Sequence, residues 1–212
     1  MKQLLIIGAR GWGREVCDIA KACIAAGAEF LVKGFLDDKS DALDGYDNYP
    51  PILDPVETYD VKPDDVFVCA LGDVNYKKHY SDIILNKGGE FISLVHPTAF
   101  FGSNVKIGKG CIIGPYVSIS SDSKVADFVT FLIKSHVGHD CSIGDYTHIG
   151  TLTNISGFVT IGKMVTIHPC CNIIPHKKVG DNAIIGTGSV VISKVKEGTT
   201  VFGNPAKKLE IK

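Results

Sequence analysis

From Val95 to Lys196 the hydrophobic positions recur every six residues, in seventeen consecutive units without an insertion. Each unit opens with Val, Ile or Phe, and four residues later comes Ala, Cys, Ser, Thr or Val, with Lys177 as the exception. Glycine follows the opening residue in nine of the units. An apolar position that stays in phase over 102 residues predicts short stacked β-strands and not helices.

Each unit is expected to form one short strand and one tight turn. The opening branched residue points into a narrow interior, and the small fifth residue fills the remaining space. Glycine after the apolar residue is expected to relieve the backbone at the bend. Three units close a coil of 18 residues, so each residue stacks on the residue 18 positions further along the chain.

Residues 1–94 follow a different pattern, with longer apolar runs and helical spacing between them. Strands are predicted at 3–8, 30–36, 66–71 and 91–95, and the segment 40–63 is expected to be loop-rich. Two helices lie between strands, and their predicted apolar faces are Val16, Ile19, Ala20 and Cys23 in the first, and Tyr76, Tyr80, Ile83 and Ile84 in the second. The alternation is typical of a βαβ half of a nucleotide-binding sheet. We therefore expect an α/β half-Rossmann domain at 1–94 and a parallel β-helix at 95–212.

The turn after the first strand reads Gly8-Ala9-Arg10-Gly11-Trp12-Gly13. Such a turn lets phosphates approach the backbone and the positive end of the helix, and an acid after the second strand suits ribose hydroxyls. The order is GxxGxG rather than GxGxxG, and the domain is too short for the second half of a dinucleotide site. The pattern favours a mononucleotide or nucleotide-sugar site over NAD, with a purely structural turn as the alternative.

Composition narrows the classes of function. The 22 Lys and Arg residues against 23 Asp and Glu argue against nucleic acid as a partner. The N-terminal apolar run 4–7 is too short for a signal peptide or a membrane span. Seven cysteines without CxxC spacing indicate reduced thiols and a cytoplasmic protein.

Together the two halves resemble the family of sialic acid O-acetyltransferases and nucleotide-amino-sugar N-acetyltransferases, of the bacillosamine and perosamine type. The motifs that carry the resemblance are the first turn, Phe35-Leu36-Asp37-Asp38, residues 138–148 (GHDCSIGDYTH), Ser156-Gly157, residues 185–191 (IGTGSVV) and residues 203–207 (GNPAK). The resemblance implies a left-handed β-helix, acetyl-CoA as co-substrate, no metal, and a homotrimer with its active site between subunits. It also implies acetylation of a nucleotide-linked sugar or sialic acid for bacterial surface glycan synthesis.

The same resemblance assigns roles to individual positions. It places the general base at His139, a supporting acid at Asp140, and an acetyl-CoA contact near the thioester at His148. Main-chain contacts to acetyl-CoA fall at Pro169, Gly186, Thr187 and Gly188. Acceptor contacts fall at Arg10, Gly11, Trp12, Asp37, Asp38 and Gly72.

The repeat phase supports the assignment of His139. Its neighbours Val137 and Cys141 occupy the inward first and fifth positions, so His139 is expected to project near a corner. An acceptor that attacks a thioester must lose a proton, and an imidazole is suited to take it. Asp140 can orient the ring. Cys141 is expected to point inward, so we expect direct transfer in a ternary complex without a covalent acyl-enzyme.

Some positions depart from the family pattern. Relatives commonly have a small residue and a His where this chain has Arg10 and Trp12, Asn-Thr at the place of Leu132-Ile133, and Glu at the place of Gly138. The sugar, its nucleotide and the choice between N- and O-acetylation therefore stay open.

Two other classes of protein use a similar helix. A zinc enzyme of the γ-carbonic anhydrase type needs histidine ligands more widely spaced than His136 and His139. A non-catalytic binding or assembly module is the other alternative.

Overall fold

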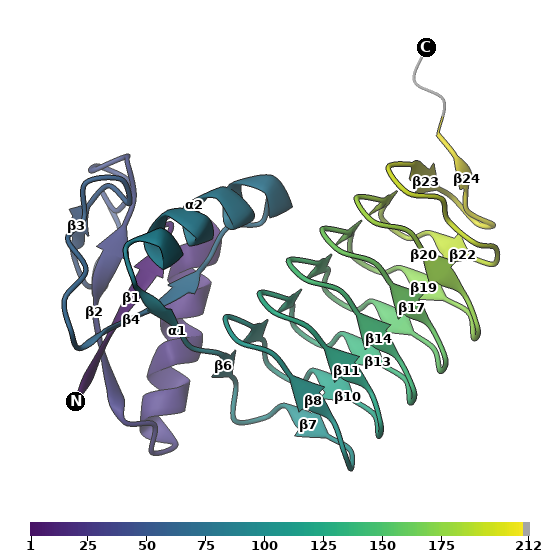
Figure 1. The fold of residues 1–212 in the computed structure, drawn as a ribbon, viewed down its shortest axis with the longest axis horizontal. Helices are drawn as coiled ribbons and strands as arrows, with labels where there is room; N and C mark the ends of the chain where they lie inside the picture. The colour runs from purple at the N-terminus through teal and green to yellow at the C-terminus, as the bar shows by residue number, and fades with distance from the viewer. Residues whose placement is uncertain (210–212) are drawn as a thin grey trace. The chain divides into compact units, whose positions relative to one another are not determined.

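The structure, a computed structural model, describes residues 1–209 (Figure 1). The chain divides into two compact units, Met1–Pro97 and Thr98–Lys212. Residues 210–212 of the expected second domain lie outside the described residues. Within the described part, no helix is long and apolar enough to cross a membrane.

The first unit holds a five-stranded parallel sheet in the order β3-β2-β1-β4-β5. Its elements in chain order are β1 (Lys2–Ile7), α1 (Gly11–Ala25), β2 (Phe30–Leu36), β3 (Ile52–Asp54), β4 (Asp65–Cys69), α2 (Val74–Asn86) and β5 (Glu90–Phe91), followed by β6 (Leu94–Val95). The strands β1 and β4 are almost wholly buried, as expected for central strands of a parallel sheet. The segment 40–63 is loop-rich as predicted and contains the three-residue strand β3. One expectation needs correction, because the predicted strand at 91–95 is divided between β5 and β6.

The two helices differ in how well their buried faces were predicted. The four residues predicted for α1 are all buried. The buried face of α2 instead holds Val74, Lys77, Ser81 and Ile84. Tyr76 is 63% exposed, so the predicted apolar face of α2 was wrong at that end of the helix. Helical spacing alone does not distinguish a side chain that faces the core from one that faces a pocket.

The second unit is a parallel β-helix whose short strands, of two residues except for β23, stack in three ladders (Figure 1). The first face holds β7 (Phe100–Phe101), β10 (Ser118–Ile119), β13 (His136–Val137), β16 (Asn154–Ile155), β19 (Asn172–Ile173) and β22 (Val190–Val191). The second face holds β8 (Lys106–Ile107), β11 (Lys124–Val125), β14 (Ser142–Ile143), β17 (Thr160–Ile161) and β20 (Lys178–Val179). The third face holds β9 (Ile112–Ile113), β12 (Thr130–Phe131), β15 (His148–Ile149), β18 (Thr166–Ile167), β21 (Ile184–Ile185) and β23 (Thr200–Phe202), with β24 (Lys207–Lys208) antiparallel to β23.

The register confirms the 18-residue coil, since Ser118 pairs with His136 and His136 pairs with Asn154. The interior is built as predicted, from the opening residues together with small fifth residues. Polar groups at the fifth position bond to the backbone of the next coil: Ser123 Oγ donates to Gly138 O at 2.8 Å, and Thr147 Oγ1 donates to Gly162 O at 2.9 Å. These hydroxyls therefore satisfy their hydrogen-bonding needs inside a dry core.

The bends differ from expectation. The positive φ angles fall at the fourth position of the units, as at Asp140 (φ 56°) and Phe158 (φ 59°), and not at the glycines of the second position. Those glycines are required for close stacking instead. A Cβ on Gly138 would lie 2.5 Å from Gly157 N, and a Cβ on Gly144 would lie 2.6 Å from Gly162 C. Glycine there lets one coil lie directly against the next.

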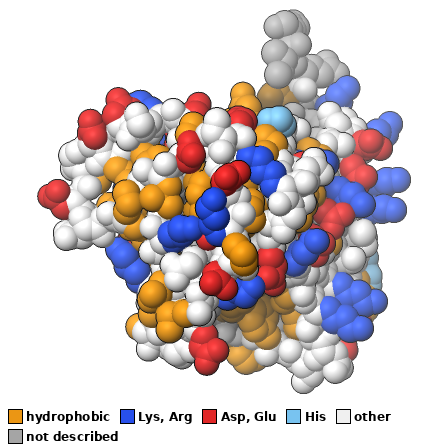
Figure 2. Space-filling view, turned by 60° about the vertical axis from the view of Figure 1, so that its left-hand side comes forward, with side chains coloured by type: hydrophobic (Ala, Val, Ile, Leu, Met, Phe, Trp, Pro, Cys, Tyr) orange, Lys and Arg blue, Asp and Glu red, His pale blue; other side chains and the backbone are white. Residues whose placement is uncertain are grey.

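Charge is divided unevenly along the chain. Residues 1–97 carry 10 Lys and Arg against 16 Asp and Glu, whereas residues 98–212 carry 12 against 7. On the face of the molecule in Figure 2, acidic and basic side chains are interspersed with hydrophobic ones. The net charge of the whole chain is close to zero because an acidic first unit is balanced by a basic second unit.

Candidate active site

His139 and Asp140 occupy the corner between β13 and β14, where the first face meets the second. The Nδ1–H of His139 donates to Asp140 Oδ2 at 2.8 Å. Because a carboxylate only accepts, Nδ1 carries the proton and the lone pair of Nε2 is available to take another. The two side chains are 56% and 46% exposed, so the pair is within reach of a molecule from solvent.

Cys141, the next residue, points inward as predicted. Its side chain is buried, and its Sγ donates to Ser156 O at 3.1 Å. Burial raises the pKa of this thiol, which disfavours the nucleophilic thiolate. The chemistry available at this corner is therefore that of the imidazole and the carboxylate.

His148 opens β15 on the third face and pairs with Thr130 and Thr166. The strand β14 lies between it and His139 in the same coil. Within one chain, the two histidines thus belong to different parts of the prism.

Four of the residues expected to contact acetyl-CoA, Pro169, Gly186, Thr187 and Gly188, lie at the corner where the third face meets the first. Gly188 N donates to Pro169 O at 2.9 Å, and Ile167 pairs with Ile185, which confirms that the segments around Pro169 and Thr187 stack. Gly188 has φ +69° and open space where a Cβ would point. Gly186 has a packing reason to be glycine, because a Cβ there would lie 2.4 Å from Phe202 Cδ2. This corner is not the corner of His139.

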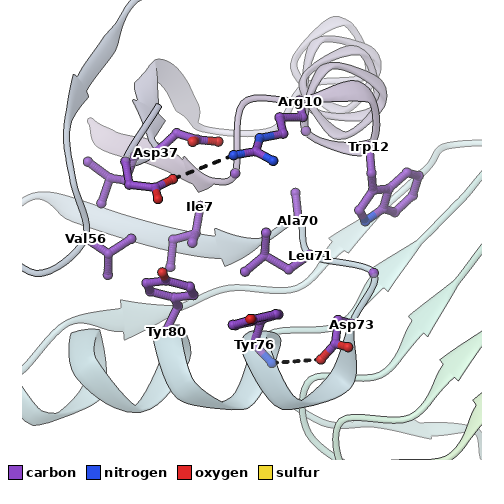
Figure 3. Close-up of a pocket in the computed structure, with 15 residues that line it drawn as sticks. Ile7, Arg10, Trp12, Asp37, Val56, Ala70, Leu71, Asp73, Tyr76 and Tyr80 are labelled. Carbon is purple, nitrogen blue, oxygen red and sulfur yellow. Dashed lines mark hydrogen bonds and ion pairs between the residues drawn. The ribbon is translucent and has the colours of Figure 1, made fainter. Parts of the chain in front are cut away.

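The first unit contains a pocket of about 500 Å³ (Figure 3). It lies at the carboxyl ends of β1, β2 and β4, where the strand order of the sheet reverses and where open α/β sheets bind ligands. Among the predicted acceptor contacts, Arg10, Trp12, Asp37, Asp38 and Gly72 line the pocket. Gly11 is exposed beside them but is not part of the lining.

Sequence reasoning missed the part of the pocket that α2 supplies. Tyr76 and Tyr80 rise from this helix toward the loop that carries Arg10 (Figure 3), with their ring centroids 6.5 Å apart. Asp73 caps the same helix by accepting from the backbone N–H of Asn75 and Tyr76. The signal for Asp73 is its place as an acid directly after a buried strand, whereas helical spacing predicts a packing role for the two tyrosines.

The two acids after β2 have different surroundings. Asp37 Oδ2 accepts from Ala9 N at 2.7 Å, and its Oδ1 accepts from Lys39 N at 3.0 Å. Both carboxylate oxygens of Asp37 therefore accept hydrogen bonds from the backbone, and one of these bonds fixes the loop after β1. Asp38 Oδ1 lies 3.9 Å from Arg10 Nη2, and both of these side chains are well exposed. Arg10 and Asp38 are thus the charged pair that a ligand would meet.

His136 lies on β13, three residues before His139. Its Nδ1 is 2.7 Å from Ser118 Oγ, and burial lowers the pKa of the imidazole. Among residues 1–209, no group of three or more His, Cys, Asp or Glu side chains is arranged to hold a metal ion.

Comparisons with known proteins agree with this architecture. Residues 3–84 match the PglD N-terminal domain family. GDP-perosamine N-acetyltransferase of Escherichia coli O157:H7 is 31% identical over 167 residues, which cover 68% of this chain and 67% of that protein.

The solved structures that match nearly the whole chain include two acetyltransferases. The acetyltransferase domain of PglB from Neisseria gonorrhoeae FA1090, in complex with acetyl coenzyme A, is 26% identical with a TM-score of 0.88, over 98% of this chain and 99% of that one. PerB from Caulobacter crescentus, in complex with CoA and GDP-perosamine, has the same fold, with 22% identity and a TM-score of 0.88 over 99% and 98% of the two chains. The resemblance expected from the sequence is thereby confirmed, and the chain belongs to the nucleotide-amino-sugar N-acetyltransferase family that includes GDP-perosamine N-acetyltransferase.

Proposed function

We propose that this protein transfers the acetyl group of acetyl-CoA to the amino group of a nucleotide-linked amino sugar. The observation that carries the proposal is the exposed pair of His139 and Asp140, hydrogen-bonded through Nδ1, on the β-helix of a family member. Family membership disfavours a zinc enzyme or an assembly module. A sugar hydroxyl, as in sialic acid, is the alternative acceptor.

In the reaction, Nε2 of His139 takes the proton that the acceptor amine loses as its nitrogen attacks. The carboxylate of Asp140 keeps Nδ1 protonated and stabilises the positive charge that the ring acquires. Acetyl-CoA supplies the acetyl group as an activated thioester. The new C–N bond replaces the C–S bond, and the proton held by His139 neutralises the departing sulfur.

The corner formed by Pro169, Thr187 and Gly188 fits the pantetheine arm of acetyl-CoA. Thr187 and Gly188 are exposed, and the missing side chain of Gly188 leaves backbone accessible. The excess of basic residues in the second unit suits the phosphates of the nucleotide part. We assign acetyl-CoA binding to this corner together with Gly186 and His148.

The pocket of the first unit supplies the acceptor site in this proposal. Arg10 offers a cation to a diphosphate beside the N-terminus of α1, whose first turn contains no acidic residue. Asp38 offers a carboxylate to the hydroxyl groups of the sugar or ribose, and Tyr76 and Tyr80 offer rings on which the nucleobase can stack. Trp12 and Gly72 complete the lining, and Asp37 shapes it by holding the first loop.

We further propose that the enzyme is a homotrimer with active sites between subunits. The second face presents exposed Lys106, Lys124 and Lys178, whereas the outward side chains of the first and third faces from β10 to β21 are uncharged or histidine. Two faces with few charges suit contact with neighbouring copies. Association would also bring His139 of one copy toward the acetyl-CoA corner of another. Free cysteines, six of them buried, support a cytoplasmic location.

A thiol-release assay with acetyl-CoA tests the proposal. The acceptor panel contains UDP-, GDP- and dTDP-linked amino sugars and free sialic acids, and hydroxylamine treatment of the product distinguishes an ester from an amide. We expect turnover with an amino sugar and its loss in His139→Ala, with the trimer unchanged by light scattering. Undiminished turnover in that variant would contradict the assignment of the base.

A further inference from the structure

Gly157 is an exception within the repeat. In all the remaining units from Val95 to Lys196, the third position of the hexapeptide carries a side chain, as at Ser121, Lys163 and Pro175. The backbone does not demand glycine there, because the positive φ of this turn belongs to the next residue, Phe158. A reason specific to this coil must therefore account for the missing side chain.

The imidazole of His139 occupies the space that a side chain on Gly157 would need. A Cβ built on Gly157 would lie 2.7 Å from Nε2 of His139, 2.9 Å from Cε1 and 3.2 Å from Cδ2. The two residues are 18 positions apart and stack in one column, since Val137 pairs with Ile155 in the strands that precede them. The ring of His139 thus lies across Gly157, with the basic nitrogen closest to it.

Two further contacts fix the direction of the ring. Phe158 meets the imidazole edge-on, with centroids 4.9 Å apart and planes at 89°. The phenyl ring is itself stacked on His176, at 4.8 Å and 6°. Nδ1 is held by Asp140. The imidazole is therefore bounded by the carboxylate, the bare Cα of Gly157 and the ring of Phe158.

We infer that Gly157 is a positioning residue, whose missing side chain lets His139 lie across the adjacent coil with Nε2 directed at the acceptor, and that Phe158 limits the rotation of the ring. The inference rests on the proposed role of His139 as base. The three atoms nearest to an alanine Cβ at 157 all belong to the imidazole, and this side chain is 56% exposed, so it can move aside. The cost of Gly157→Ala should therefore fall on catalysis more than on folding.

The test compares Gly157→Ala with Lys163→Ala, which places alanine at the third position of the following unit. We expect Gly157→Ala to lower kcat at least about tenfold, since a displaced base loses much of its contribution, with the KM for acetyl-CoA unchanged. Lys163→Ala should keep the wild-type kcat. In protein labelled with ¹³C at His Cε1, the His139 signal, assigned with His139→Ala, should shift in Gly157→Ala and stay in place in Lys163→Ala.

Each outcome bears on the inference. Unchanged kcat and an unchanged His139 signal in Gly157→Ala would overturn it. If Gly157→Ala is instead unstable, the double variant Gly157→Ala/His139→Ala shows whether a clash with the imidazole is the cause. A Tm restored to that of His139→Ala supports the clash, and a Tm that stays low refutes it. A wild-type protein that acetylates nothing would contradict the proposed function, while the His139 signal and the stability comparison would still test the geometry.

Discussion

The contribution of Asp140 to the activity of His139 can be tested with Asp140→Asn. Asparagine keeps the shape of the side chain and can still accept from Nδ1–H of His139, so the substitution removes mainly the negative charge. It also tolerates the left-handed backbone of this position, where φ is 56°. Alanine would be a less specific probe, because it adds a backbone cost of roughly 1–2 kcal/mol.

The expected magnitude follows from the geometry. As His139 takes the proton, its ring becomes positive with Nδ1 at 2.8 Å from the carboxylate oxygen. Both side chains are about half exposed, so the dielectric constant of water is the appropriate limit and the attraction is about 1.5 kcal/mol. Loss of this attraction in the transition state corresponds to a fall in kcat of roughly tenfold.

Steady-state thiol-release kinetics measure this effect, with thermal unfolding as the control for stability. We expect a lower kcat, an unchanged KM for acetyl-CoA and an unchanged Tm. A kcat within twofold of the wild type would show that the carboxylate does not assist the ring. A loss as deep as that of His139→Ala would show that Asp140 also fixes the tautomer of the ring, because the amide of asparagine can donate to Nδ1, and the magnitude worked from charge alone would then be wrong.

Two further predictions concern the acetyl-CoA corner and the stability of the first unit. Cys170 is the exposed cysteine beside Pro169, so iodoacetamide should label it first in the native protein. Saturating acetyl-CoA should slow this labelling, as measured by peptide mass spectrometry. Equal labelling rates with and without acetyl-CoA would place acetyl-CoA elsewhere. Asp65→Asn should lower the free energy of unfolding by about 3 kcal/mol in urea titrations at pH 7, because the buried carboxylate accepts from Lys33 Nζ at 2.7 Å and from Tyr59 OH at 2.7 Å. Burial alone would raise the pKa of Asp65, but the hydrogen bonds outweigh it and lower the pKa below 3.8. The stabilisation is therefore complete above that value and is lost as the pH falls through the lowered pKa. A difference between wild type and variant that grows as the pH falls below 3.8 would contradict the assignment.

Local rules were sufficient for the β-helix and less so for the helices of the first unit. The period of six determined the coil, its inward residues and the outward direction of His139, because side-chain direction in a strand follows directly from phase. The same phase turned Cys141 inward, where burial raises its pKa. The face of α2 was predicted less well, because Tyr76 and Tyr80 line a pocket instead of the core.

The two-part architecture could be predicted from the six-residue period and the apolar runs before it, and the local motifs gave the family resemblance that made His139 and Asp140 the candidate pair. Only the tertiary structure decided what surrounds them. The contact between His139 and Gly157 joins residues 18 positions apart through the stacking of coils, and the division of roles between Asp37 and Asp38 depends on which backbone amides lie within reach. Such distances arise from packing between segments, which a linear pattern of hydrophobic and polar residues does not encode.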